Sequence, residues 1–392
     1  MIRIISIFFI IIFFSCENDL KVNAEWQDTP VIYGILDPGS YYEDNNEHYI
    51  RIQKSFLGNL AASEMAQQSD SIYYNNNSIE VTVERIENNN VLETFILEPV
   101  FDIIKEDGYF SNENHQVYKF NEELTVNGDP LNEYRISFYN SNHQTESSSI
   151  TKIVEPIRIR KYPTSNPTNP NPLIGDIQFG EDNPQEFIKD INIKPSENAK
   201  MYSLSLRFNY IEFNTQFQTR DTLHVDWTFS PKTATEFQLS GGPTTSDIEF
   251  NINVNDFYKY LASTLNQPDN NTYRYPIGVY YQGTDGAQIP GIKYPCIELY
   301  FEALNLDLYN YIISSSDPGL VENRPVFNNI TNGAGLFASK SSHNVTLKFD
   351  NSSNDSLSFG RFTKDLNFLY FSEIGDGISA FDSNGILINY TD

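Results

Sequence analysis

Hydrophobic and polar residues alternate along much of the chain, and a period of two predicts β-strands with one buried and one solvated face. The pattern is clearest in segment 78–86, where Ile and Val alternate with Glu and Thr. Segment 31–36 is apolar throughout and is also predicted to be a strand. Further strands are predicted at 48–54, 93–97, 116–120, 133–139, 157–160, 200–213, 222–229, 277–281, 297–301, 345–349 and 366–371.

Three segments and one pair of glycines depart from the strand pattern. A brief helix is predicted within 57–68, and a second helix at 255–265 begins with a capping Asn and has apolar residues on one face. A third helix is expected to begin after Asn305, which can cap it. Gly333 and Gly335 are expected where two backbones approach closely, because glycine has no side chain.

A proline-rich segment divides the chain into two predicted domains. The run that begins at Tyr162 contains four prolines, which cannot donate hydrogen bonds to a sheet. We therefore expect a stiff linker at 161–174 between an N-terminal β-sandwich domain at 29–160 and a C-terminal β-rich domain at 175–392. The predicted fold class is mainly β, with two β-sandwich-like, immunoglobulin-like domains and a few short helices in the second. The alternative is one domain with a long internal loop.

The N-terminus has the order of segments that is typical of a secretory signal peptide. Arg3 supplies a positive charge, residues 4–14 are apolar apart from one serine, and a serine precedes Cys16. This run is shorter than the ~20 residues that a membrane helix needs. A cysteine directly after the small residue indicates a lipoprotein signal, with 1–15 removed, Cys16 acylated and 16–28 forming a tether. The alternative is an ordinary signal peptide in which the cysteine has no role.

The acidic composition argues against two classes of partner, nucleic acids and anionic lipids. The 392 residues carry a formal net charge of −26, which would repel the phosphates of a nucleic acid and the headgroups of anionic lipids. A lipid anchor therefore remains the expected attachment to a membrane. The acidity is expected to reflect a solvated surface, and weak binding of cations or of a basic partner is the alternative.

No motif in the sequence identifies a reaction. A phosphate-binding loop, a dinucleotide fingerprint, a nucleophile elbow and a zinc-protease motif are all lacking. The five His are scattered, and Cys296 lies in an alternating segment that is typical of a buried strand. The oxygen-rich segments 350–355 and 382–385 are expected to be polar turns rather than calcium sites. We therefore predict a non-enzymatic protein without cofactor or metal. The alternative is a hydrolase whose catalytic carboxylate pair is not marked by a sequence motif.

Paired tyrosines are the best candidates for contact with a partner. Tyr41 and Tyr42, like Tyr73 and Tyr74, flank turns or strand ends, where a tyrosine can stack on a sugar or anchor a protein. The alternative is that one ring of each pair belongs to the core and the other is half exposed.

Five short stretches resemble a Bacteroidota lipoprotein family that is catalogued as domain of unknown function 4249. They are VIYGILD at 31–37, HYIRI at 48–52, KSFLG at 54–58, YNYI at 309–312 and NITNGAGLFAS at 329–339. The resemblance covers nearly the whole mature chain. It implies an all-β, two-part exported lipoprotein, often encoded beside TonB-dependent outer-membrane receptors, and it implies no catalytic residues. The acidic Glu17 and Asp19 are also similar to the signal that directs such lipoproteins to the cell surface.

Three tripeptides resemble the O-glycosylation sequon of the same bacteria, in which Asp precedes Ser or Thr and an apolar residue follows. They would place glycans on Ser71, Thr222 and Ser356, and each acceptor would have to be exposed.

These observations favour a surface-exposed outer-membrane lipoprotein that is a binding or accessory component of a TonB-dependent nutrient uptake system. The second hypothesis is a structural or adhesive cell-surface protein, in which the sandwiches are spacers and the tyrosine-rich loops make contact.

Overall fold

The structure is a computed structural model of the chain. It describes residues 26–56, 61–101, 103–105, 108–113, 115–126, 133–164, 176–177, 179–180, 188–217, 219–235, 246–277, 296–316, 327–349, 351–374, 377–381 and 386–388. The predicted signal peptide, Cys16, most of the predicted tether and linker, and the predicted turn at 382–385 lie outside these residues.

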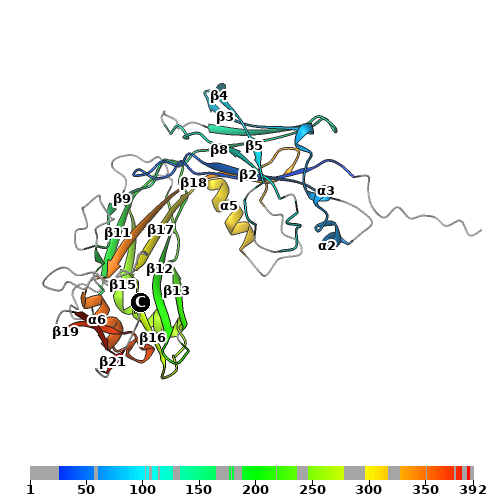
Figure 1. Cartoon of the computed structure of the whole chain (residues 1–392). Helices are drawn as coiled ribbons and strands as arrows, with labels where there is room; N and C mark the ends of the chain where they lie inside the picture. The colour runs from blue at the N-terminus through cyan, green and yellow to red at the C-terminus, as the bar shows by residue number, and fades with distance from the viewer. Residues whose placement is uncertain are drawn as a thin grey trace, which may run out of the picture.

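The described chain is mainly β, which confirms the predicted fold class (Figure 1). The strands are β1 (Pro30–Leu36), β2 (His48–Lys54), β3 (Ile79–Glu87), β4 (Asn90–Ile96), β5 (Glu98–Val100), β6 (Val117–Phe120), β7 (Glu133–Asn140), β8 (Thr145–Lys152), β9 (Arg158–Lys161), β10 (Asp176–Ile177), β11 (Ile188–Lys194), β12 (Met201–Asn214), β13 (Thr219–Thr228), β14 (Lys232–Thr233), β15 (Ile248–Asn253), β16 (Thr272–Pro276), β17 (Ile297–Leu304), β18 (Ala334–Phe349), β19 (Tyr370–Ile374), β20 (Gly377–Phe381) and β21 (Leu387–Ile388).

The helices are short. They are α2 (Ala62–Met65), α3 (Ser69–Ile72), α4 (Val254–Thr264), α5 (Leu306–Ser315), α6 (Asn351–Phe359) and the 3₁₀ turns η1 (Asn76–Ser78) and η6 (Lys364–Leu366). Asn305 caps α5 as expected, since its side chain accepts a hydrogen bond from the backbone of Leu308. None of the helices in the described part of the chain has the length and apolar character of a membrane span.

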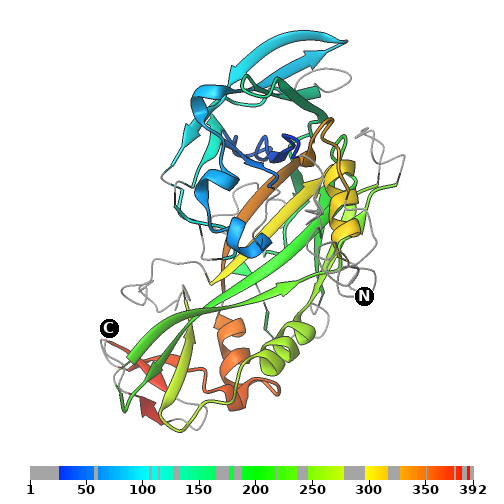
Figure 2. The ribbon, with the colours of Figure 1, turned by 90° about the vertical axis from the view of Figure 1, so that its right-hand side faces the viewer.

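One large sheet combines strands from early and late in the chain. Its strands follow the order β13-β12-β17-β18-β1-β2-β6-β5. The long strand β18 pairs with β1 in parallel along its first half and with β17 in antiparallel along its second half. Figure 2 shows β12, β17 and β18 lying side by side. Backbone hydrogen bonds therefore join segments from both sides of the predicted linker.

Two hydrophobic cores lie between pairs of sheets. The first core is shared by the β12–β17–β18 part of the large sheet, the sheet β15-β11-β9 and helices α4 and α6. The second core lies between the β1–β2–β6 part of the large sheet and the sheet β4-β3-β7-β8. Phe337 of β18 belongs to this second core, so a strand from late in the chain completes the sandwich that strands β1–β8 build.

Close backbone approach at the two predicted glycines is confirmed. Gly335 has a φ of +119°, and a side chain there would meet the carbonyl oxygen of Ile32 on β1. At Gly333 an added Cβ would lie 2.8 Å from the carbonyl oxygen of Pro30. Both glycines therefore allow β18 to lie against β1.

Some predicted elements are wrong in type or position. Segment 350–355 was predicted as a polar turn, but its described residues 351–355 form the first part of α6, whose Leu357 is fully buried in the first core. The predicted strand at 366–371 begins only at Tyr370, because η6 precedes it and Asn367 adopts a left-handed conformation with a φ of 55°. A strand, β16, lies at Thr272–Pro276, directly before the segment predicted at 277–281. Ile277 lies outside this strand, and residues 278–281 are outside the described range.

Candidate functional site

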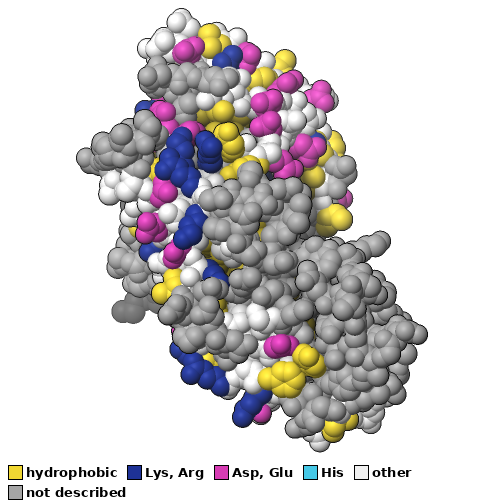
Figure 3. All heavy atoms as spheres, turned by 90° about the vertical axis from the view of Figure 1, so that its left-hand side faces the viewer, with side chains coloured by type: hydrophobic (Ala, Val, Ile, Leu, Met, Phe, Trp, Pro, Cys, Tyr) yellow, Lys and Arg dark blue, Asp and Glu magenta, His cyan; other side chains and the backbone are white. Residues whose placement is uncertain are grey.

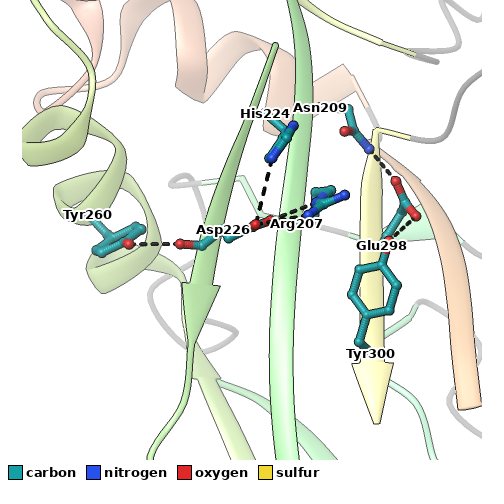
Figure 4. Close-up of polar contacts among 7 residues, drawn as sticks. All are labelled: Arg207, Asn209, His224, Asp226, Tyr260, Glu298 and Tyr300. Carbon is teal, nitrogen blue, oxygen red and sulfur yellow. Dashed lines mark hydrogen bonds and ion pairs between the residues drawn. The ribbon is translucent and has the colours of Figure 1, made fainter. Parts of the chain in front are cut away.

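The outer face of the large sheet carries a cluster of polar side chains that contact one another. Along β12 the residues from Tyr202 to Tyr210 alternate, so that every second side chain enters the first core. The intervening side chains point away from that core, as do their neighbours on β13, β17 and β18. We call this surface the open face; its central residues are Arg207, Asn209, Asp226, Glu298 and Tyr300 (Figure 4).

Arg207 and Asp226 form a bidentate ion pair across the β12–β13 ladder. The guanidinium donates from Nε and Nη2 to the two carboxylate oxygens, at 2.7 Å and 2.9 Å. Hydrogen bonds from Arg207 lower the pKa of Asp226, and the same contacts raise the pKa of Arg207. Tyr260 of α4 fixes this part of β13 from the core side, since its hydroxyl donates to the backbone oxygen of Asp226 at 2.8 Å. The pair therefore presents two opposite charges in a fixed position.

Glu298 is the centre of a second group of contacts. Its two oxygens accept hydrogen bonds from Asn209 at 2.7 Å and from the hydroxyl of Tyr300 at 2.5 Å. Burial and the neighbouring Glu298 raise the pKa of Tyr300 to about 12, so the phenol remains a hydrogen-bond donor at neutral pH. The guanidinium of Arg207 lies 5.7 Å from the centre of the Tyr300 ring, which links the two groups.

Two hollows on the open face meet at Tyr300 and Glu302. One has a volume of about 410 Å³ and lies against the loop from Gly39 to Asn45. The other has a volume of about 560 Å³ and reaches from Arg207 to Ile312 of α5. Together they form a concave surface with hydroxyl, amide, carboxylate and guanidinium groups around one aromatic ring.

Acidic groups outnumber basic ones around these hollows. Lys340 lies 2.7 Å from Glu302, so its charge is neutralised. Two further acidic residues, Glu43 and Asp44, line the smaller hollow. The surface therefore suits a polar ligand that is neutral or cationic. In the part of the chain that the structure describes, no group of His, Cys, Asp and Glu could hold a metal ion.

Basic side chains gather on a different face. Figure 3 shows Lys and Arg side chains along the side that carries sheet β15-β11-β9. Several of these have acidic partners: Arg160 with Asp247 at 2.6 Å, and Lys161 with Asp190 at 3.0 Å. Lys194 likewise contacts Glu155. This face therefore offers little uncompensated positive charge.

Removal of the ion pair on the open face should cost little stability. We expect Asp226→Asn to lower the free energy of unfolding by no more than about 1 kcal/mol, because solvent screens exposed pairs. The side chains of Arg207 and Asp226 are 34% and 48% exposed. The measurement is urea unfolding followed by circular dichroism.

The control for this prediction is Glu212→Gln. This change removes the carboxylate that pairs with Arg274, whose side chain is 5% exposed. It should lower the free energy of unfolding by about 3 kcal/mol. Equal losses in Asp226→Asn and Glu212→Gln would contradict a weak role for the exposed pair.

The four tyrosines singled out in the sequence have different environments. Tyr41 is 60% exposed and lies under the guanidinium of Arg158, 4.3 Å from the ring centre. Tyr42 is half-buried, and its hydroxyl donates to the backbone oxygen of Ile159 at 2.7 Å. Tyr73 and Tyr74 are only 6% and 5% exposed, so the expectation that they are available to a partner is wrong. Both rings are buried in the N-terminal part of the protein, by which we mean the described residues 26–161, and Tyr74 donates a hydrogen bond to Asp28 there.

The three predicted glycosylation acceptors also differ in exposure. Thr222 is exposed on β13, and Ser71 is partly exposed on α3. Ser356 is 7% exposed and donates to the backbone oxygen of Ser352 inside α6, so the folded chain does not present it. Cys16, the predicted lipidation site, lies outside the described residues.

This difference predicts where a glycan is found. In protein purified from its native source, we expect peptide mass spectrometry to find the modification at Thr222 and none at Ser356, because a transferase cannot reach a buried hydroxyl. Thr222→Ala should remove the corresponding mass. A glycan on Ser356 would contradict the prediction.

Sequence reasoning missed the open-face cluster. The signal is present in the alternation of 203–209 and 298–302, where polar residues occupy every second position. That pattern is typical of any half-exposed sheet, so only the pairing of β12, β13 and β17 identifies these residues as neighbours.

Comparisons with known proteins add little. No family model matches the chain, and no curated protein matches it. Among solved structures, the chain is similar to the C-terminal globular domain of an oligosaccharyltransferase from Pyrococcus abyssi. The sequence identity is 9%, the TM-score is 0.20, and the similarity covers 63% of this chain and 45% of that one. This likeness is too weak to support an argument about fold or function.

Proposed function

We propose that the protein is an outer-membrane lipoprotein, anchored through Cys16, that serves as a non-enzymatic binding or accessory component of a TonB-dependent nutrient uptake system. The observation that carries the proposal is the N-terminal order of a basic residue, an apolar run, Ser15 and Cys16. The resemblance of segments 31–37 and 329–339 to the lipoprotein family supports the same role.

The open face supports a binding role. A concave, polar surface with a tyrosine at its centre can present donors, acceptors and an aromatic ring to a ligand or to a partner protein. Tyr300 and Glu302 lie where the two hollows meet, so they are the residues through which a bound molecule would touch both.

The proposal is tested by native isolation of the tagged protein from detergent-solubilised outer membranes, followed by mass spectrometry. Recovery of one TonB-dependent receptor in a near-equal amount is the expected result. Cys16→Ser is the control, because a protein without acyl chains should leave the membrane fraction. Recovery of the lipoprotein alone would contradict the accessory role.

Variants of the open face test whether it holds the partner. Tyr300→Ala should reduce co-purification of the receptor several-fold. The matched control is Tyr139→Ala, because Tyr139 is 39% exposed on β7 of a different sheet. Equal recovery with the two variants would exclude the open face as the contact surface.

An adhesive surface protein is the second candidate, and the exposed ring of Tyr41 beside Arg158 favours it. A deletion strain with normal nutrient uptake but altered surface attachment would support this candidate, and Tyr41→Ala should reproduce the altered attachment.

A further inference from the structure

One loop of the N-terminal part exposes an unusual amount of apolar surface. The described residues between β5 and β6 are 101, 103–105, 108–113 and 115–116, and we call them the apolar loop. Five of them have large hydrophobic side chains that face solvent. These are Phe101 (58% exposed), Ile103 (38%), Ile104 (96%), Tyr109 (81%) and Phe110 (42%). Removing apolar side chains of this size from water lowers the free energy. Such a cluster on a loop therefore indicates an interaction surface.

Hydrogen bonds fix the position of the apolar loop on the folded protein. Its backbone is fixed to the turn after α2, since Ser111 donates to the oxygen of Ala66 at 2.8 Å and Gln67 donates to the oxygen of Tyr109 at 2.5 Å. Within the loop, the ammonium of Lys105 donates to the oxygen of Phe110 at 2.7 Å. The only described cation of the loop therefore turns inward, while Ile104 and Tyr109 remain outside.

The same helical segment lies beside the start of the described chain. Trp26 donates a hydrogen bond to the backbone oxygen of Ser55 at 3.1 Å. It also lines a hollow of about 270 Å³ together with Met65 of α2 and Asp70 of α3. Figure 1 shows α2 and α3 at one end of the N-terminal part. The predicted tether and the apolar loop therefore meet the folded protein at the same end.

We propose that the apolar loop rests in the lipid surface of the membrane to which Cys16 is anchored. The inference depends on the proposed lipidation of Cys16. Trp26 stands ten positions after Cys16, and even a fully extended chain over that interval spans no more than ~35 Å. The bilayer is thus within reach of the loop, and solvent-exposed aliphatic and aromatic side chains suit the boundary between headgroups and acyl chains.

The experiment places a polarity-sensitive fluorophore on the loop of the native lipoprotein. Cys296 is fully buried and Cys16 would be acylated, so a thiol introduced by Ile104→Cys is the reactive one. The labelled protein is incorporated into phosphatidylcholine vesicles, and emission is measured with and without lipids that carry doxyl quenchers. The control is Phe217→Cys, because Phe217 is 67% exposed in the distant hairpin between β12 and β13.

A blue-shifted emission at position 104 that doxyl lipids quench, with neither effect at position 217, is the expected result. Addition of Tyr109→Ser should weaken the quenching several-fold, and this exposed position tolerates the change without loss of fold. A protein that floats with the vesicles but shows no shift at position 104 would overturn the proposal while the lipidation stands. A blue shift in native membranes but not in pure lipid vesicles would also overturn the proposal, because it would mean that the loop contacts a membrane protein and not the bilayer. Failure to float would refute the lipidation and this inference together.

Discussion

Gly335→Ala should lower the free energy of unfolding by about 3 kcal/mol or more. Gly335 has a φ of +119°, a conformation that costs any residue with a Cβ. The new methyl group would also overlap the carbonyl oxygen of Ile32, which belongs to the β1 backbone and cannot rotate away as a side chain could. Relief requires β18 to separate from β1, and that pairing extends from Val31 to Leu36. The measurement is urea unfolding, with circular dichroism at several wavelengths to detect more than one transition.

The matched control is Gly108→Ala. A Cβ at Gly108 would have no atom within 4 Å, so the stability of this variant should stay within about 0.5 kcal/mol of the wild type. The same midpoint for Gly335→Ala and Gly108→Ala would show that the β1–β18 contact tolerates a side chain. A large loss in Gly335→Ala alone would establish that the pairing of β1 with β18 supports the whole fold.

The strand pattern of the sequence predicts local structure well where burial follows hydrophobicity. β3 and β12 lie close to their predicted positions because most of their buried residues are Ile, Val, Leu and aromatic side chains. β8 was missed for a physical reason: its buried positions are Ser147, Ser149 and Thr151, so no apolar period marks them. Thr151 accepts a hydrogen bond from Asn305, which lies far away in the sequence. Burial of small polar residues through such distant partners cannot be deduced from a local pattern.

The order in which the strands pair could not be predicted from the sequence pattern either. Periodicity distinguishes the two faces of a strand, but it does not identify the neighbouring strand. The parallel pairing of β1 with β18 joins residues that are about three hundred positions apart. The open face depends on the same kind of information, because Arg207, Asp226 and Glu298 come from three strands. The two glycines were predictable, since glycine at a position of close approach has a local physical cause.

His343 should make the protein sensitive to mild acid. Its ring lies between the ring of Tyr42, at 4.8 Å between centres, and that of Phe301, at 6.3 Å. Nε2 is buried and has no hydrogen-bond partner within the described part of the chain. Burial lowers the pKa of His343 to about 4, from an ordinary value of about 6.5. The folded protein thus keeps this imidazole neutral in a pH range where an unfolded chain would protonate it.

The sign of the effect follows from which state binds the proton. At pH 7 the imidazole is neutral in both states, so His343 has no influence on the pH dependence there. Between pH 6.5 and pH 4 the unfolded chain takes up a proton and the folded protein does not, so stability is lost as the pH falls. The shift corresponds to about 3 kcal/mol in full, and the partial exposure of the side chain reduces the expected loss to about 2 kcal/mol.

His343→Phe should remove this part of the acid sensitivity, because phenylalanine fills the same space between the two rings and does not titrate. The free energy of unfolding is measured in urea at pH 7 and at pH 4.5 for the wild type and the variant. The wild type should lose about 2 kcal/mol more than the variant over this range. His224→Phe is the control, because the side chain of His224 is 50% exposed and water reaches it in both states. An equal loss in the wild type and in His343→Phe would mean that the folded protein accommodates the charged imidazole, and the stack of Tyr42, His343 and Phe301 would then have to open at acid pH.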